Sequence, residues 1–212
     1  RLSRPIFDAN YQPMLTVKAP PAGQDRLTAS GNNLYAGVTS AEVDKFAQKY
    51  ELNSRLVKRD GRLVEEVYRA GTPDGRIPAG RYAQFLNRSI AHLELAAQQA
   101  EPAQAEVIRK LIRYYRTGEK ADWYAYNIAW VGLDSNVDFI HGFVEVYLDP
   151  LGSKGAWESV ISFVDTEQTH LMRSFADNAQ YFENHAPWLD VYKKQGVQPI
   201  VGCALAISRS DG

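Results

Sequence analysis

The segment Asp138–Gly152 holds the residues whose types and spacing could do chemistry. Its alternating pattern predicts a β-strand over 137–148, and strand side chains point alternately to two faces. One face would carry His141, Phe143, Glu145 and Tyr147. The other face is apolar, with Ile140, Val144, Val146 and Leu148. We therefore expect the apolar face to pack on the core and the polar face to stay open.

An acid and a phenol side by side suit recognition of a polar substrate. Glu145 can accept hydrogen bonds from an ammonium group, and Tyr147 can donate to a carbonyl or a developing oxyanion. His141 shares the predicted face and could contact the same ligand. From the residues alone, a half-exposed strand with a solvated polar face is the simpler reading. Both readings stay open at this point.

The sequence gives only weak signals of a metal-binding site. The four histidines form no H-E-x-x-H or H-E-x-x-x-H arrangement: His92, His141, His170 and His185. Glu167-x-x-His170 has the spacing of metal sites in helical bundles, but such sites need further ligands from partner helices. His92-x-Glu94 and Glu183-x-His185 are weaker. We interpret all three as solvated helix surface and predict no metal bound by this chain.

Composition narrows the class of protein. The 212 residues carry 24 basic and 25 acidic side chains, a formal net charge of -1. This balance gives no electrostatic reason to expect nucleic acid or a membrane as partner. The one cysteine, Cys203, lies in an apolar run that reads as a buried strand, and it cannot form an internal disulfide.

The elements around the polar segment predict an α+β fold, with mixed helices and a small β-sheet or partial barrel. Residues 1–27 read as irregular because of Pro13, Pro20, Pro21 and Gly23. Ser40 is the expected N-cap of a following helix. Two β-prone runs over 54–58 and 62–68 flank Asp60-Gly61, which predicts a hairpin.

Three helices are expected next, over 80–100, from Pro102 to a stop at Gly118, and over 121–130. The first should turn one apolar face inward: Tyr82, Phe85, Leu86, Ile90, Leu93 and Ala97. A strand over 157–164, a helix over 166–182 and a last strand over 197–207 follow. Four large side chains of this part are expected to face a core: Phe163, Leu171, Phe175 and Tyr181.

Residues 142–155 read G-F-V-E-V-Y-L-D-P-L-G-S-K-G and are followed by Trp157-Glu158. This run resembles the G-F-x-E-x-Y-x-D-P-x-G-x-[RK] signature of the dipeptidyl peptidase III family of zinc peptidases. The resemblance extends upstream through 53–58, 65–68, 80–83 and 112–118. Val146 stands where many members have serine, and Lys154 replaces the commoner arginine, which keeps the charge but loses a bidentate fork.

The resemblance implies a two-lobed enzyme that removes dipeptides from the free N-terminus of oligopeptides. Carried over by position, Glu145 would anchor the substrate ammonium and Tyr147 would act in catalysis on the scissile carbonyl. His141 would be a further substrate-binding residue. Zinc would belong to the parent enzyme, bound by a downstream H-E-x-x-G-H helix that this chain lacks. The family is chiefly cytoplasmic.

Under this reading, residues 28–212 form a partial domain, truncated at both ends, whose partner is the remaining lobe of the parent. The isolated chain is then expected to be inactive. The alternative is a non-catalytic peptide-binding or interaction module of the same fold.

Overall fold

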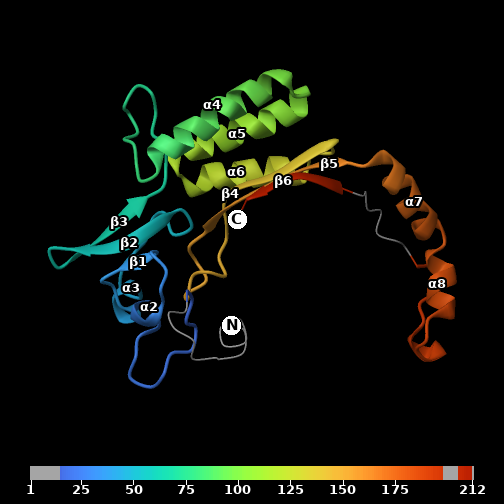
Figure 1. Ribbon diagram of the computed structural model, residues 1–212, viewed down its shortest axis with the longest axis horizontal. Coiled ribbons are helices and arrows are strands. Elements are labelled where there is room, and N and C mark those ends of the chain that lie inside the picture. Colours follow the sequence, from blue (N-terminus) through green and yellow to red (C-terminus); the bar gives the residue numbers. More distant parts are fainter. Residues whose placement is uncertain (1–14, 198–204, 212) are drawn as a thin grey trace, which may run out of the picture. The chain divides into compact units, whose positions relative to one another are not determined.

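The computed structural model describes residues 15–197 and 205–211 (Figure 1). The chain divides into two compact units. The described part of the first unit is residues 15–134 and Gly142–Glu158, and that of the second is Ser135–His141 with the residues from Ser159 onward. The secondary structure is mixed helix and strand, so the predicted α+β class is confirmed.

The described part of the first unit begins with two short helices around a small apolar core. Helix α2 (Arg26–Ala29) is capped by Asp25, and the N-cap of helix α3 (Ser40–Val43) is Thr39 rather than the predicted Ser40. The Glu42 carboxylate accepts hydrogen bonds from the Thr39 N–H and hydroxyl, both at 3.0 Å, which moves the cap by one residue. The core cluster comprises Leu27, Leu34, Tyr35, Val38, Val43 and Leu56.

The predicted hairpin is confirmed. Strands β2 (Ser54–Arg59) and β3 (Arg62–Val67) pair antiparallel, and β1 (Tyr35–Ala36) adds parallel to β2. Asp60 and Gly61 both have positive φ, 50° and 75°, as a tight two-residue hairpin turn requires.

Helices α4 (Ala83–Gln99), α5 (Pro102–Thr117) and α6 (Lys120–Val131) confirm the three predicted helices. Helix α5 packs against both α4 and α6 (Figure 1). It begins with Pro102 and ends at Gly118, whose φ of 71° is the left-handed cap that glycine tolerates. Leu111 is fully buried at its centre. The prediction that Phe85 of α4 faces inward is wrong, because this side chain is 61% exposed.

A second sheet has the order β4-β5-β6, formed by β4 (Val137–Glu145), β5 (Ala156–Val164) and β6 (Leu205–Asp211). Strands β5 and β6 pair antiparallel, with an irregularity between Ile161 and Ser162. The expected last strand over 197–207 overlaps β6 only from Leu205, and Cys203 lies outside the described residues.

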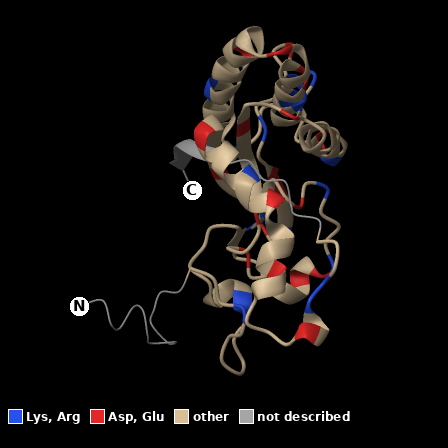
Figure 2. Ribbon diagram, turned by 90° about the vertical axis from the view of Figure 1, so that its right-hand side faces the viewer, with Lys and Arg blue, Asp and Glu red and all other residues tan. Residues whose placement is uncertain are grey.

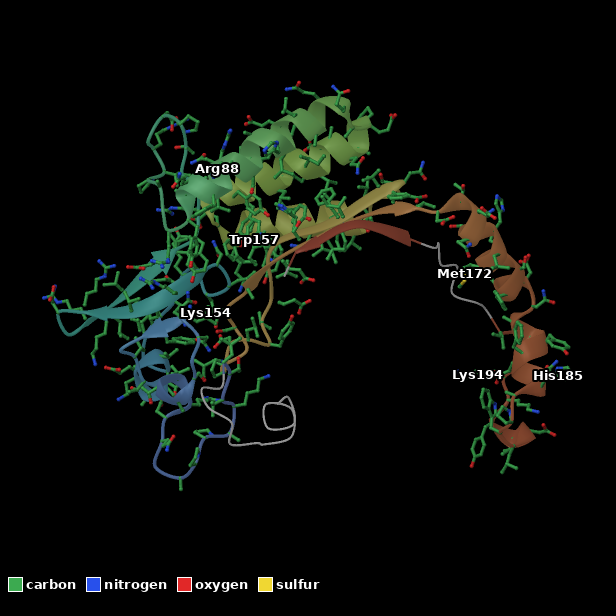
Figure 3. The ribbon with its side chains drawn as sticks, viewed as in Figure 1. Arg88, Lys154, Trp157, Met172, His185 and Lys194 are labelled. Atoms are coloured by element: carbon green, nitrogen blue, oxygen red, sulfur yellow. The ribbon has the colours of Figure 1, made fainter. Side chains whose placement is uncertain are left out.

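The helix expected over 166–182 is two helices, α7 (Thr166–Asp177) and α8 (Ala179–His185), separated at Asn178. A short 3-10 helix, η1 (Asp190–Tyr192), follows. The expectation that four large side chains of β5, α7 and α8 face a core is wrong. All four are exposed by about half: Phe163 47%, Leu171 53%, Phe175 52% and Tyr181 57%. No residue of α7 or α8 is buried, and Figure 3 shows Met172 and His185 on these two helices.

Figure 2 shows basic and acidic residues interspersed along the same elements rather than separated by sign. Within the described ranges, no helix has the length and apolarity needed to cross a membrane.

Candidate functional site

The face assignment predicted for β4 is wrong in two respects. The strand ends at Glu145, so Tyr147 lies in the following turn rather than on the strand. Phe143, placed on the open face, is 6% exposed, whereas Ile140, placed on the core face, is 38% exposed. The aromatic ring is the larger group to bury, and it decides which face packs inward.

The buried side of the strand end is an aromatic cluster. The Phe143 ring lies 4.9 Å from Tyr68 and 5.1 Å from Trp157, the latter edge-on. Trp157 also lies 5.8 Å from Tyr115. Gly142 has a φ of 131°, and a Cβ there would come within 3.0 Å of the Tyr115 hydroxyl. Glycine at 142 therefore lets the strand approach helix α5 closely.

Of the two predicted chemical side chains, Glu145 ends β4 and Tyr147 lies two positions later, in the turn. Glu145 is half-buried, and Tyr147 is 61% exposed. Among the described residues, none forms a hydrogen bond or ion pair with either side chain. Both side chains are thus available to a ligand. Strand alternation determines the direction of the Glu145 side chain only, because Tyr147 lies beyond the end of β4.

His141 lies on the same strand, in its second-unit portion. It is half-buried, and burial lowers the pKa of its imidazole below the usual 6.5. At neutral pH the ring is therefore uncharged and can act as a hydrogen-bonding group rather than as a cation.

Asp149 organises the turn that carries Tyr147. Its carboxylate is fully buried and accepts hydrogen bonds from four groups of the following loop at 2.8 to 3.0 Å: the N–H groups of Leu151, Ser153 and Lys154, and the Ser153 hydroxyl. It also accepts the Tyr35 hydroxyl at 3.0 Å. A carboxylate with this many donors fixes the loop backbone in one conformation.

Lys154 anchors the other end of this loop. Its side chain is fully buried, and its ammonium donates to Gln48 Oε1 at 2.6 Å, to Ser54 Oγ at 3.1 Å and to the Glu51 carbonyl at 3.4 Å. Burial lowers the pKa of Lys154 from 10.5 to about 8, although the charges of Glu65 and Asp149 oppose that shift. The loop after β4 is therefore tied to the segment before β2.

A third attachment holds the residue next to Tyr147. The Leu148 carbonyl accepts hydrogen bonds from Thr16 Oγ1 at 2.6 Å and from Asn32 Nδ2 at 3.3 Å. The backbone that presents the phenol is therefore held from both sides, which is the preorganisation that a binding or catalytic group needs.

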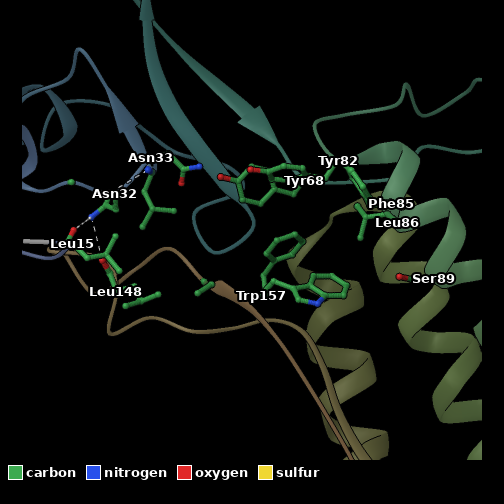
Figure 4. Close-up of a pocket in the computed structure, with 15 residues that line it drawn as sticks. Leu15, Asn32, Asn33, Tyr68, Tyr82, Phe85, Leu86, Ser89, Leu148 and Trp157 are labelled. Atoms are coloured by element: carbon green, nitrogen blue, oxygen red, sulfur yellow. Dashed lines mark hydrogen bonds between the residues drawn. The ribbon is translucent and has the colours of Figure 1, made fainter. Parts of the chain in front are cut away.

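Beside this segment the first unit contains a pocket of about 700 Å³ (Figure 4). Its walls are mainly apolar and include five aromatic residues: Tyr68, Tyr82, Phe85, Phe143 and Trp157. None of the described lining residues is charged. The pocket suits apolar groups and has no side chain for acid–base chemistry at neutral pH, so the chemical candidates remain on the neighbouring turn.

Sequence reasoning missed the roles of Asp149, Lys154 and Tyr82. The Asp-Pro-x-Gly pattern signalled a turn, but the burial of both charges depends on partners about 100 residues away. Tyr82 has a φ of 61°, which is uncommon for a residue with a Cβ, and it caps α4 while its ring lies 5.0 Å from Tyr68. No local pattern signalled that strain.

Metal-ligating side chains are scattered over the described residues, 15–197 and 205–211. Nowhere in these ranges do three His, Cys, Asp or Glu side chains gather in a metal-binding arrangement. Glu167 and His170 are both exposed on α7. The donor set present in the described part of the chain does not fit a zinc site.

Peptidase family M49 matches residues 41–200. Dipeptidyl peptidase 3 of Dictyostelium discoideum is 28% identical over 118 residues, which are 55% of this chain and 17% of that protein. Nudix hydrolase 3 of Arabidopsis thaliana is 29% identical over 118 residues, 55% of this chain and 15% of that protein.

The fold is also found among solved structures. That of DPP III from Caldithrix abyssi superposes with a TM-score of 0.57 at 24% identity, covering 78% of this chain and 32% of that one. The chain thus spans about a sixth of the curated relatives it matches and about a third of this solved structure. Because the family match covers most of its residues, the chain belongs to peptidase family M49.

Proposed function

We propose that this chain is part of a zinc-dependent exopeptidase that releases dipeptides from the free N-terminus of oligopeptides. The observation that supports the proposal is that Glu145 has no described polar partner and that Tyr147, two positions later, is exposed on the turn before buried Asp149. Membership of peptidase family M49 supports a peptidase parent.

Glu145 is proposed to bind the substrate ammonium. A carboxylate held at a fixed distance from the reacting bond lets an enzyme count residues from the peptide's end. Tyr147 is proposed to donate its hydroxyl to the scissile carbonyl and to the oxyanion that develops there. Such a donor acts best when it is positioned before the reaction, and the anchored turn supplies that positioning.

Zinc in the proposed parent is held by residues outside this chain, so the roles of Glu145 and Tyr147 concern the substrate alone. The isolated chain is accordingly proposed to be inactive, with the remaining lobe of the parent as its partner. His141 is kept as a proposed substrate contact, and a cytoplasmic location, implied by the family resemblance, is proposed for the parent.

The test uses the full-length protein and a dipeptidyl chromogenic substrate. Tyr147→Phe should lower kcat by about 10²–10³ with little change in KM, since it removes one oxyanion donor. Glu145→Gln should raise KM and should reduce the preference for a free over an acetylated N-terminus. His141→Gln should raise KM alone. Tyr124→Phe is the matched control, because Tyr124 is a comparably exposed tyrosine at 53%.

Unchanged kcat in Tyr147→Phe would reject the catalytic role. Peptide binding without any hydrolysis by the full-length protein would instead support the alternative, a non-catalytic peptide-binding module. Zinc-dependent cleavage by the 212-residue chain itself would overturn the proposal that the zinc ligands lie outside this chain.

A further inference from the structure

The first unit contains a second pocket, here called the Trp123 pocket, which neither Glu145 nor Tyr147 lines. Its volume is about 420 Å³, and its wall includes Glu51, Tyr114, Lys120 and Trp123. Two of its walls come from α5 and α6, which lie side by side (Figure 1). Every described residue that lines it belongs to the first unit. A hollow of this size lies within the range of small-molecule sites.

The wall of the Trp123 pocket includes a buried tyrosine whose hydroxyl is unpaired. Tyr114 is only 2% exposed, and among the described residues its hydroxyl has no hydrogen-bond partner. Burying such a group unpaired costs free energy, so in native proteins it is normally bound by a water molecule or a ligand. Burial raises the pKa of Tyr114 above its ordinary value, so the hydroxyl keeps its proton and can donate to an acceptor.

The positive end of helix α6 also lies at this pocket. The helix begins at Lys120, and its N-cap residue, Glu119, makes no side-chain capping hydrogen bond. The Glu119 carboxylate instead accepts hydrogen bonds from Lys49 Nζ at 2.7 Å and from the Tyr50 hydroxyl at 2.9 Å. No side chain of this N-cap therefore occupies the first turn of α6, and the helix dipole favours an anion there.

The ion pairs leave one charge of each sign on the wall of the pocket. Lys49 is paired with Glu119. Lys120 and Glu51 are exposed, and neither forms an ion pair with a residue in the described ranges. A ligand that carries both a carboxylate and an ammonium group would complement these two charges.

Trp123 gives the same pocket a flat apolar surface. Its ring lies 5.0 Å from the ring of Tyr114 and 5.6 Å from that of Tyr126. These tilted contacts with two buried rings hold the orientation of the indole. The pocket can therefore offer a fixed aromatic face to a planar group of a ligand.

We propose that the Trp123 pocket binds a zwitterion with an aromatic side chain, supplied either as a free aromatic amino acid or as a dipeptide that contains one. Its carboxylate lies at Lys120 and the start of α6, where the Tyr114 hydroxyl is a further donor. Its ammonium lies at Glu51, and its ring packs on Trp123. The proposal does not rely on the proposed peptidase activity, because none of these residues belongs to the site around Glu145 and Tyr147.

Calorimetric titration of the 212-residue chain with L-tryptophan and with the dipeptide tryptophyl-alanine tests the site. At least one of them should bind with a Kd below about 1 mM, and the tighter of the two identifies the source of the ligand. Tryptamine lacks the carboxylate, N-acetyl-tryptophan lacks the ammonium and alanine lacks the ring, so each should bind about tenfold more weakly or worse. Absence of binding by both zwitterions, or equal binding of the three analogues, would overturn the proposal.

Two variants assign the binding to this pocket. Tyr114→Phe and Lys120→Gln should each raise the Kd by about fivefold to tenfold, because each removes one donor to the carboxylate. The matched controls are Tyr126→Phe, a buried tyrosine of α6, and Lys110→Gln on α5; neither residue lines the pocket, and both variants should keep the Kd of the wild type.

Thermal unfolding separates lost binding from lost structure. Tyr114→Phe should keep or raise the Tm, because it removes a buried hydroxyl that has no partner. An unchanged Kd in Tyr114→Phe would mean that water alone satisfies this hydroxyl, and it would reject the proposed site. Binding is measured without a peptidase assay, so failure of this site and failure of the catalytic proposal are distinguishable.

Discussion

The ammonium group of Lys154 donates a hydrogen bond to the Ser54 hydroxyl at 3.1 Å, joining two residues that are 100 positions apart. Ser54 opens strand β2, and Lys154 closes the loop that begins at Asp149. Through this contact the hairpin sheet supports the turn that presents Tyr147. The two most buried charges of the loop therefore serve its conformation, while the exposed phenol is left for a ligand.

The buried charge of Lys154 predicts an unusual pH dependence. Its pKa is about 8 in the folded chain and about 10.5 in the unfolded chain, so the unfolded chain binds more protons between these values. The free energy of unfolding should therefore rise from pH 8 upward, by up to about 3 kcal/mol from this group.

Urea denaturation of the 212-residue chain and of Lys154→Met at pH 7, 8, 9 and 9.5 measures that effect. The free energy of unfolding of the wild type, relative to that of Lys154→Met, should increase as the pH rises. Parallel stability curves would show that Lys154 titrates normally. Lys154→Arg, which cannot lose its proton in this range, should also lack the rise.

Tyr35 and Asp149 should contribute to the free energy of unfolding in a strongly coupled way, because their side chains share a hydrogen bond. Burial and the Asp149 charge raise the pKa of Tyr35, so its hydroxyl remains a donor at all ordinary pH values. Tyr35→Phe should cost about 1–3 kcal/mol, as for other hydrogen bonds to a charged acceptor. Asp149→Asn should cost more, because it also disturbs three backbone donors of the loop.

A double-mutant cycle by urea denaturation separates these contributions. The double variant should be more stable than the sum of the two single losses predicts, by about 1 kcal/mol or more. Strict additivity would mean that the two side chains contribute independently despite their 3.0 Å separation.

Gly155 should tolerate substitution less well than Gly152. A Cβ at Gly155 would lie 2.8 Å from the Phe143 carbonyl carbon and 2.9 Å from its oxygen, so the backbone itself must move. Gly155→Ala should therefore cost about 1–3 kcal/mol or more and alter the near-UV circular dichroism of Trp157. Gly152→Ala meets no atom within 4 Å and should cost about 1–2 kcal/mol, from its φ of 71° alone.

Both glycine variants are measured by thermal unfolding of the 212-residue chain. A larger loss for Gly152→Ala than for Gly155→Ala would contradict the close approach of Gly155 to β4.

His141 should make the fold sensitive to mild acid. Burial lowers its pKa below 6.5, so protons bind more readily to the unfolded chain, and stability is lost as the pH falls below 6.5. Urea denaturation at pH 7.5, 6.5 and 5.5 should show a smaller acid loss for His141→Gln than for the wild type. Equal losses would place the acid sensitivity on other groups.

The local elements of this protein could be predicted from sequence because their signals are local. Asp60-Gly61 specified a hairpin turn, and Pro102 and Gly118 marked the ends of α5. The residues Glu145 and Tyr147 could likewise be selected as chemical candidates from their types and from the surrounding motif.

Tertiary structure decided what those patterns left open. Which face of β4 is buried depended on Phe143 meeting Tyr68 and Trp157, rings that come from distant segments. The position of Tyr147 depended on Asp149, whose carboxylate gathers donors from its own loop and from Tyr35. The exposure of Leu171, Phe175 and Tyr181 on α7 and α8 could not be predicted from their helical spacing either. Periodicity identifies an apolar face, but only the surrounding chain determines whether anything covers it.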